Sequence, residues 1–224
     1  MAYSVIQSRA KRSSVFTLDV LRMYRHPKNI VYFSFCDLPA KTANSVHIMK
    51  MCQALGRAGW VTDLVAKVRA RSSNDLFLYY GVEDGFSITS FPLPRLRIIG
   101  RLVFLLFGIS HIVQKSAALA YTRDLFAAFL LTLLGVRIVF ECHEVPRRKL
   151  KSFLLGRILK HKNTKLAVYI SHRMKDILHR EVHSYGMIRS KEVIAHDGVD
   201  VNAFILTETQ HEIRKKLKLP MGKN

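Results

Sequence analysis

Residues 119–141, LAYTRDLFAAFLLTLLGVRIVFE, contain the pattern that decides the fold. Two short β-rich runs, residues 119–123 and 137–141, flank an apolar segment at 125–134 that has the length of a helix and ends before Gly135. A strand, a helix and a second strand in this order are typical of a βαβ unit, in which both strands belong to one parallel sheet.

The same alternation extends over most of the chain. Further strands are predicted at residues 30–35, 61–66, 86–91, 166–170 and 193–196, and further helices at 45–57, 98–116, 149–160, 171–183 and 207–218. Residues 69–74 are polar and predict a loop. The central runs are continuously apolar, as expected of strands covered by helices on both faces. We therefore predict an α/β fold with a Rossmann-like, doubly wound and mostly parallel sheet.

The ends of the chain differ from this middle part. Residues 1–28 form a basic extension with one candidate amphipathic helix at 15–24, and the Rossmann-like domain is expected to span residues 29–200. Residues 201–224 have the composition of a linker helix leading towards a domain that is missing from this chain. The extension has no uninterrupted apolar core, so no secretory signal is predicted. The apolar segments at 98–113 and 125–136 are interrupted by charge or too short to cross a bilayer.

The composition limits the class of protein. About half of the 224 residues are hydrophobic and 23% are charged, which excludes general disorder and coiled-coil repeats. The three cysteines lie far apart in the sequence, so neither a disulfide framework nor a zinc site built from cysteines is expected. This cysteine usage is typical of a protein in a reducing compartment.

The chain is strongly basic, with 36 Lys and Arg against 16 Asp and Glu and a net charge of +20. Residues 85–123 contain no acid, and residues 145–175 contain ten Lys or Arg and no acid. This segregation favours phosphate-bearing ligands or an anionic membrane surface. Nucleic acid is a secondary interpretation, because the motifs of RNA-recognition modules are missing.

Ligands of open parallel sheets bind at the carboxyl ends of the strands, so residues that follow strands are candidate site residues. Asn44 and Ser45 stand at the start of the first predicted helix, where backbone N–H groups favour an anion. For either residue taken alone, a plain N-cap is the simpler explanation. Arg123 follows the fourth strand and is a candidate ligand for phosphate or carboxylate, unless it pairs with the adjacent Asp124.

The fifth strand is followed by His143 and Glu144, with a run of cations directly after them. Histidine donates or accepts a proton near neutral pH, so His143 is the candidate catalytic residue and Glu144 a candidate substrate ligand. The alternative is that His143 bonds Glu141 or Glu144 and orders the loop.

Other kinds of site are not supported. The chain has no GxGxxG fingerprint and no P-loop, so dinucleotide and NTP sites of those types are not predicted. His179 and His183 are four residues apart, but the spacing of Glu181 departs from HExxH and no third ligand is evident, so no metal is expected.

An ordered series of segments resembles family 4 glycosyltransferases. The helix NSVHIMKMCQAL at 44–55 with GWVTDLV at 59–65 is similar to that family's first helix and second strand. YTRDL at 121–125 with GVRIVFECHE at 135–144, VYISHRMKDIL at 168–178, and VIAHDGVD at 193–200 with Phe204 resemble its later segments.

The resemblance implies the amino-terminal, acceptor-side half of a GT-B enzyme. A full-length protein of this kind would be a retaining, hexosyltransferase-type enzyme that moves a sugar from a nucleotide-sugar to a polysaccharide or lipid-linked acceptor. It would need no cofactor and no metal, and it would act in the cytoplasm, peripherally at the inner face of the plasma membrane. The resemblance also implies that His143 reaches the donor sugar, and that this half alone is inactive.

The sequence departs from the family in one loop and leaves two other functions open. Residues 40–44 lack the glycine pair that approaches the donor phosphates, and the glutamate pair of the second domain is missing. One alternative is a non-catalytic basic module that binds polyanions. The other is half of a non-hydrolysing nucleotide-sugar epimerase.

Overall fold

The structure is a computed structural model that describes residues 29–70, 72–94, 96–182, 190–196, 198 and 209–218. The predicted helix at 15–24, His183 and Phe204 lie outside these residues.

The described residues form one seven-stranded sheet in which every pair of neighbouring strands is parallel. Its strand order is β3-β2-β1-β4-β5-β6-β7, so the order reverses between β1 and β4. The strands are β1 (Asn29–Leu38), β2 (Val61–Val68), β3 (Ser87–Thr89), β4 (Leu119–Thr122), β5 (Ile138–Cys142), β6 (Thr164–Tyr169) and β7 (Lys191–Ile194). The predicted Rossmann-like α/β fold is confirmed.

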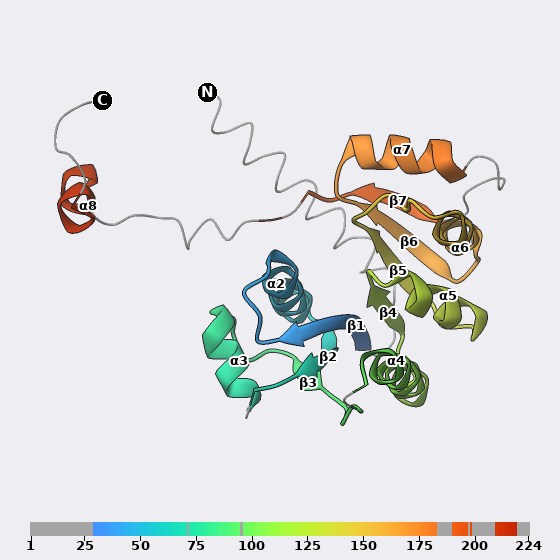
Figure 1. Ribbon diagram of the computed structural model, residues 1–224, viewed down its shortest axis with the longest axis horizontal. Coiled ribbons are helices and arrows are strands. Elements are labelled where there is room, and N and C mark those ends of the chain that lie inside the picture. Colours follow the sequence, from blue (N-terminus) through green and yellow to red (C-terminus); the bar gives the residue numbers. More distant parts are fainter. Residues whose placement is uncertain are drawn as a thin grey trace.

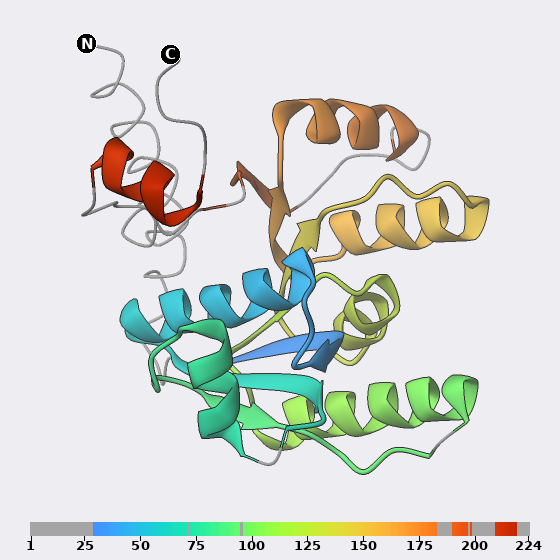
Figure 2. The ribbon, with the colours of Figure 1, turned by 60° about the vertical axis from the view of Figure 1, so that its left-hand side comes forward.

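Helices cover both faces of the sheet (Figure 1). One face carries α2 (Ala43–Arg57) and α3 (Ser73–Tyr80), and the other carries α4 (Arg97–Gln114), α5 (Leu125–Leu133), α6 (Lys149–Lys160) and α7 (His172–Val182). A further short helix, α8 (Gln210–Lys216), lies near the end of the chain. Figure 2 shows the helices running alongside the strands, as βαβ connections require.

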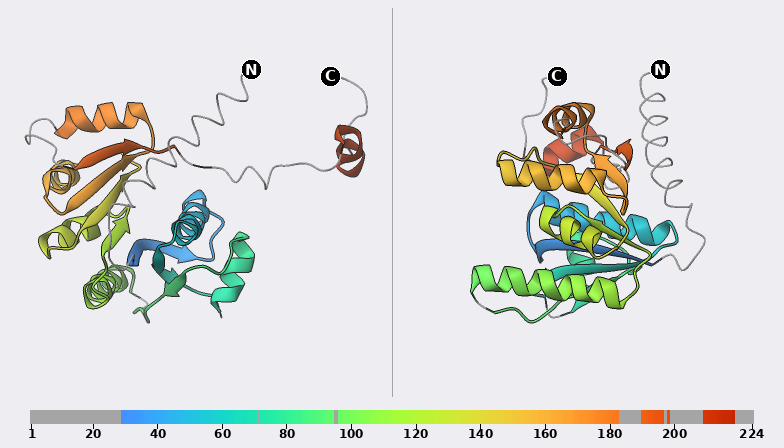
Figure 3. Two further views of the ribbon diagram at one scale, coloured as in Figure 1. Left: turned by 180° about the vertical axis from the view of Figure 1, so that it is seen from behind. Right: turned by 90° about the vertical axis from the view of Figure 1, so that its right-hand side faces the viewer.

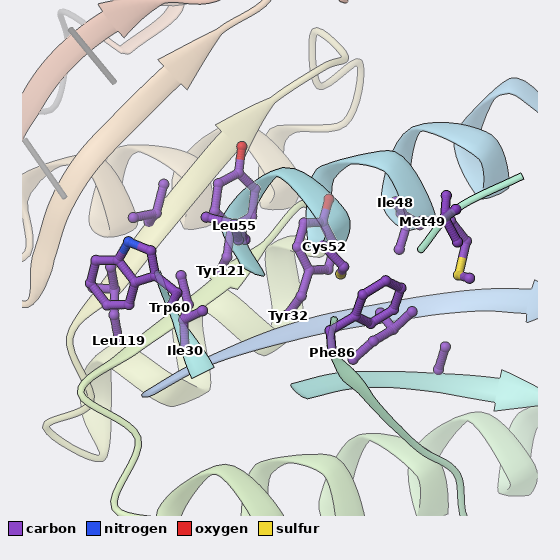
Figure 4. Packing of buried hydrophobic residues seen from close by; sticks show 14 of the residues in the cluster. Ile30, Tyr32, Ile48, Met49, Cys52, Leu55, Trp60, Phe86, Leu119 and Tyr121 are labelled. Carbon is purple, nitrogen blue, oxygen red and sulfur yellow. The ribbon is translucent and has the colours of Figure 1, made fainter. Parts of the chain in front are cut away.

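Each face has its own hydrophobic core, because successive side chains of a strand point to opposite faces. On the α2 face, the rings of Tyr32 and Tyr121 stack with centroids 4.8 Å apart, and Trp60 is buried in the same hydrophobic cluster (Figure 4). On the other face, α4 approaches β1 closely at Gly108, where an added Cβ would lie 2.3 Å from the Phe33 ring. A glycine is therefore required there for packing.

The prediction of a loop at residues 69–74 is wrong at its end, because α3 begins at Ser73. Ser72 caps this helix in a reciprocal capping box with Asp75, and Gly81 ends it with a positive φ of 56°. Only the first three residues of this helix are polar, and Leu76, Phe77 and Tyr80 after them are buried. The other predicted elements agree with the structure to within a few residues.

Among the described residues, no helix is both long enough and apolar enough to cross a membrane.

Candidate functional site

A hollow of about 490 Å³ opens at the carboxyl edge of the sheet, beside the point where the strand order reverses. This is the position at which open α/β sheets bind their ligands. Its floor is the second half of β1, which contributes Ser34 and Cys36. The other polar side chains come from the start of α2 and from the loops after β4 and β5, and they are Asn44, His47, Arg123, Asp124 and His143.

A second hollow of about 220 Å³ adjoins the first and shares Arg123, Asp124 and His143 with it. It extends towards α6, where Glu144 and Lys151 line it. The two hollows are therefore contiguous along the carboxyl edge of the sheet.

The side chain that organises this edge is Glu141, in β5. Its carboxylate is almost fully buried and has three neighbours. The Tyr121 hydroxyl donates a hydrogen bond to Oε2 at 2.6 Å, His47 Nε2 lies 3.4 Å from the same oxygen, and Arg123 Nε lies 3.2 Å from Oε1. These contacts join β4, β5 and α2, and they link Glu141, which lines the smaller hollow, to Arg123 and His47, which line the larger one.

The electrostatics keep Glu141 ionised. Burial by itself raises the pKa of this carboxyl, but the bond from His47 and the charge of Arg123 outweigh burial, so its pKa is lowered. A buried carboxylate with several charge-assisted contacts is a rigid anchor for the groups it binds. Glu141 therefore fixes the positions of two side chains that line the hollow.

Arg123 is held from both sides. Besides Glu141, it bonds Asn44, with Nη1 donating to Oδ1 at 3.0 Å. It does not pair with Asp124, whose carboxylate instead caps α5 by accepting from the Ala127 N–H at 2.8 Å and lies 3.7 Å from Arg101. The guanidinium is thus presented in a fixed orientation, which suits recognition of phosphate or carboxylate.

His143 lies at the rim of both hollows, where its imidazole is partly covered by protein and partly open to solvent. Partial burial, followed by the charge of Arg123, lowers its pKa, so the neutral imidazole predominates at neutral pH. The Glu141 carboxylate is bound by Tyr121, and the Glu144 carboxylate pairs with Lys151 at 3.0 Å. His143 bonds the backbone of Glu141.

Two of the predicted ligands differ in their surroundings. Asn44 lines the hollow and bonds Arg123, so its amide belongs to the site. Ser45 is fully buried, and its hydroxyl donates to the Ala40 carbonyl at 2.6 Å inside the capping box of α2. The cap itself is Thr42, so α2 begins two residues earlier than predicted.

Within the described ranges, no group of three or more His, Cys, Asp or Glu side chains comes together in a way that could hold a metal ion. His179 Nε2 instead lies 2.6 Å from Glu192 in β7, which ties α7 to the edge of the sheet. Besides the Asp124 carboxylate, the hollow presents the Arg123 guanidinium, the imidazoles of His47 and His143 and the Asn44 amide. These groups can bind anions and hydroxyl groups and can move protons.

Sequence reasoning missed His47 and the anchoring role of Glu141. His47 lies one helical turn after Ala43, so it faces the same edge as the helix start; this spacing was the available signal. Glu141 is an acid in a continuously apolar strand, and a buried charge of that kind requires partners.

No family model matches the chain, and no curated protein matches it. Solved structures match it in fold. Anabaena Alr3699/HepE in complex with UDP and glucose has 13% identity and a TM-score of 0.56 over 86% of this chain and 50% of that one. A glycosyltransferase from Rickettsia africae ESF-5 has 13% identity and a TM-score of 0.59 over 88% and 51%. Sucrose-phosphate synthase from Thermosynechococcus elongatus has 14% identity and a TM-score of 0.61 over 86% and 53%.

At these identities the similarity establishes a shared α/β fold. The chain spans about half the length of each of these structures.

Proposed function

We propose that this chain is the acceptor-side, amino-terminal half of a retaining GT-B glycosyltransferase of family 4, which uses a nucleotide-sugar donor. The observation that carries the proposal is the hollow at the carboxyl edge, where Glu141 holds Arg123 and His47 and where His143 stands at the rim. The shared fold with solved glycosyltransferases supports it, as does the match to about half of each of them.

In this proposal the hollow faces a second Rossmann-like domain across a cleft. Arg123 is oriented to bind a phosphate or an acceptor carboxylate at the rim. The acceptor is a polysaccharide or a lipid-linked precursor at the inner face of the plasma membrane. No metal and no further cofactor take part.

The proposed role of His143 follows from its protonation state. A neutral imidazole accepts a hydrogen bond from a sugar hydroxyl through one nitrogen and donates through the other. Its lowered pKa keeps this dual capacity at neutral pH, and Glu141 and Glu144 are each already bound by other side chains. His143 therefore positions the reacting sugar.

The test is a sugar-transfer screen with the longest natural chain that contains residues 1–224, assayed against a panel of nucleotide-sugars. We expect transfer by the wild type and a loss of about 100-fold or more in turnover for His143→Ala, the scale of a lost catalytic hydrogen bond. His161→Ala, at the end of α6 and the opposite edge of the sheet, is the control and should keep full activity.

Thermal unfolding of both variants is measured alongside. Transfer that is unchanged in His143→Ala, or that falls only as the variant unfolds, contradicts the catalytic role. Absence of transfer from every nucleotide-sugar contradicts the proposed activity and favours a non-catalytic polyanion-binding module.

A further inference from the structure

The three helices α4, α5 and α6 form a layer on one face of the sheet that contains no acidic residue. The layer carries Arg101 on α4, and Lys149, Lys151, Arg157 and Lys160 on α6. Figure 3 shows the three helices side by side in front of the sheet in its right-hand view. Contacts between α4 and α5 and between α5 and α6 make the layer continuous.

The outer side of this layer is also unusually apolar. Its exposed large hydrophobic side chains are Ile98, Ile99, Leu102, Leu106, Phe107 and Val113 on α4, Phe126 and Leu133 on α5, and Leu150 and Phe153 on α6. By contrast, α2 and α3 on the opposite face expose only Val46, Leu78 and Tyr79 among their large hydrophobic residues. Apolar side chains gathered on one face mark an interaction surface, whereas scattered ones are ordinary.

Helix α4 carries most of this surface. Ile98, Leu102 and Leu106 follow one another at a spacing of four residues and so form a stripe along the helix. Its other side packs into the core through Phe104, Ile109 and Ile112. The helix is therefore apolar both towards the sheet and away from it, which a helix facing only water is not.

We infer that the outer face of the α4–α5–α6 layer is a membrane-docking surface that inserts apolar side chains of α4 between the headgroups of an anionic bilayer. An apolar face bordered by Lys and Arg is the pattern of a helix that lies in the plane of the bilayer interface. The cations bind the anionic headgroups, and the apolar side chains enter the boundary of the acyl chains.

The charge of the layer argues against a second copy of this chain as the occupant. Two such faces placed together would oppose cations to cations, and the three helices themselves contain no acid; Asp124 and Glu144, which lie beside Arg101 and Lys151, are the acids at the border of the layer. The excess of positive charge disfavours association. An anionic lipid surface provides both the negative charge and the apolar phase that the layer requires.

The docking surface also borders the candidate site, because the two share a residue. Arg101 belongs to the layer, lies 3.7 Å from Asp124 and lines the smaller hollow. A bilayer at this face would thus lie beside the carboxyl edge of the sheet. The inference does not rest on the proposed glycosyltransferase activity, since vesicle binding without sugar transfer would leave it standing.

The first experiment measures co-sedimentation of the 224-residue chain with vesicles of phosphatidylglycerol and phosphatidylcholine. Ile98→Gln/Leu102→Gln removes two apolar side chains from the layer, and Leu78→Gln/Val61→Gln is the matched control elsewhere on the fold; Ile98 and Leu78 are both 86% exposed. We expect the first pair to weaken vesicle binding about tenfold or more and the control pair to leave it unchanged. Equal binding by the two pairs overturns the inference.

The second experiment distinguishes insertion from adsorption. Leu102→Trp adds a fluorophore to the layer against the constant background of the buried Trp60, and Leu78→Trp is its control. Brominated lipids should quench the fluorescence of the introduced tryptophan in Leu102→Trp and not in Leu78→Trp. For the protein that remains bound to vesicles at high salt, the same quenching of Leu102→Trp should be observed. Equal quenching in both variants, or dimerisation that depends on Ile98 and Leu102, overturns the inference.

Discussion

Replacement of Glu141 by glutamine tests whether this carboxylate anchors the candidate site. The substitution keeps the volume of the side chain and one acceptor oxygen for Tyr121, but it removes the negative charge that Arg123 and His47 contact at 3.2 and 3.4 Å. The Glu141 side chain is only 3% exposed, so water cannot replace the lost charge.

The magnitude follows from this burial. Removal of one partner from a buried ion pair costs about 3–5 kcal/mol, and glutamine retains part of the hydrogen bonding. We therefore expect Glu141→Gln to lower the free energy of unfolding by about 2–4 kcal/mol. For a chain of this size the midpoint of thermal unfolding should fall by roughly 6–12 °C.

The assay is equilibrium unfolding of the 224-residue chain at neutral pH, with Glu83→Gln as the matched control. Glu83 also pairs with an arginine, Arg57, at 2.7 Å, but both side chains are more than half exposed, so the same substitution should leave the midpoint unchanged. If Glu141→Gln and Glu83→Gln are equally stable, Glu141 is not the anchor described here.

The pH dependence gives an internal check. The folded-state pKa of Glu141 lies below the unfolded value of about 4.3, so its stabilisation is present above that value and is lost as the pH falls through the folded-state pKa. The difference in stability between wild type and Glu141→Gln should therefore shrink under acid conditions.

Two further predictions concern packing and protonation. Gly108→Ala should destabilise the fold by about 1–2 kcal/mol, because the new Cβ meets the buried Phe33 ring, whereas Gly85→Ala, with open space around it, should be nearly neutral in chemical denaturation. The pKa of His143 measured by NMR should lie below the value of about 6.5 expected in the urea-unfolded chain, since burial and Arg123 disfavour its charged form. As the pH falls from the unfolded-state pKa to the folded-state pKa, the free energy of unfolding of the wild type should therefore decrease, and His143→Gln should not show this decrease. A titration at or above the unfolded value contradicts the proposed neutral imidazole.

The fold was largely predictable because its signals are local. The unit at residues 119–141 shows two β-rich runs, an apolar helix and a terminating glycine in the sequence itself. Helix α3 was missed because it is short and its first three residues are polar, although Ser72 and Asp75 have the spacing of a capping box.

The candidate site was predictable only in its location. Because parallel strands end at one edge of the sheet, Arg123 and His143 could be assigned to that edge from their sequence positions alone. The partners could not be assigned in this way: Arg123 contacts Glu141 and Asn44 and leaves the adjacent Asp124 to α5. Such pairings depend on side-chain directions across three elements, which local patterns do not contain.

The most direct test of the central claim is to map nucleotide-sugar binding onto the chain. Backbone and side-chain NMR spectra of residues 1–224 are recorded during titration with nucleotide-sugars up to millimolar concentrations. The account predicts weak binding, with the largest shift changes at Asn44, His47, Arg123 and His143 around the hollow, and loss of these changes in Glu141→Gln while Glu83→Gln retains them. Shift changes that cluster elsewhere on the fold, or identical changes in the two variants, would contradict it.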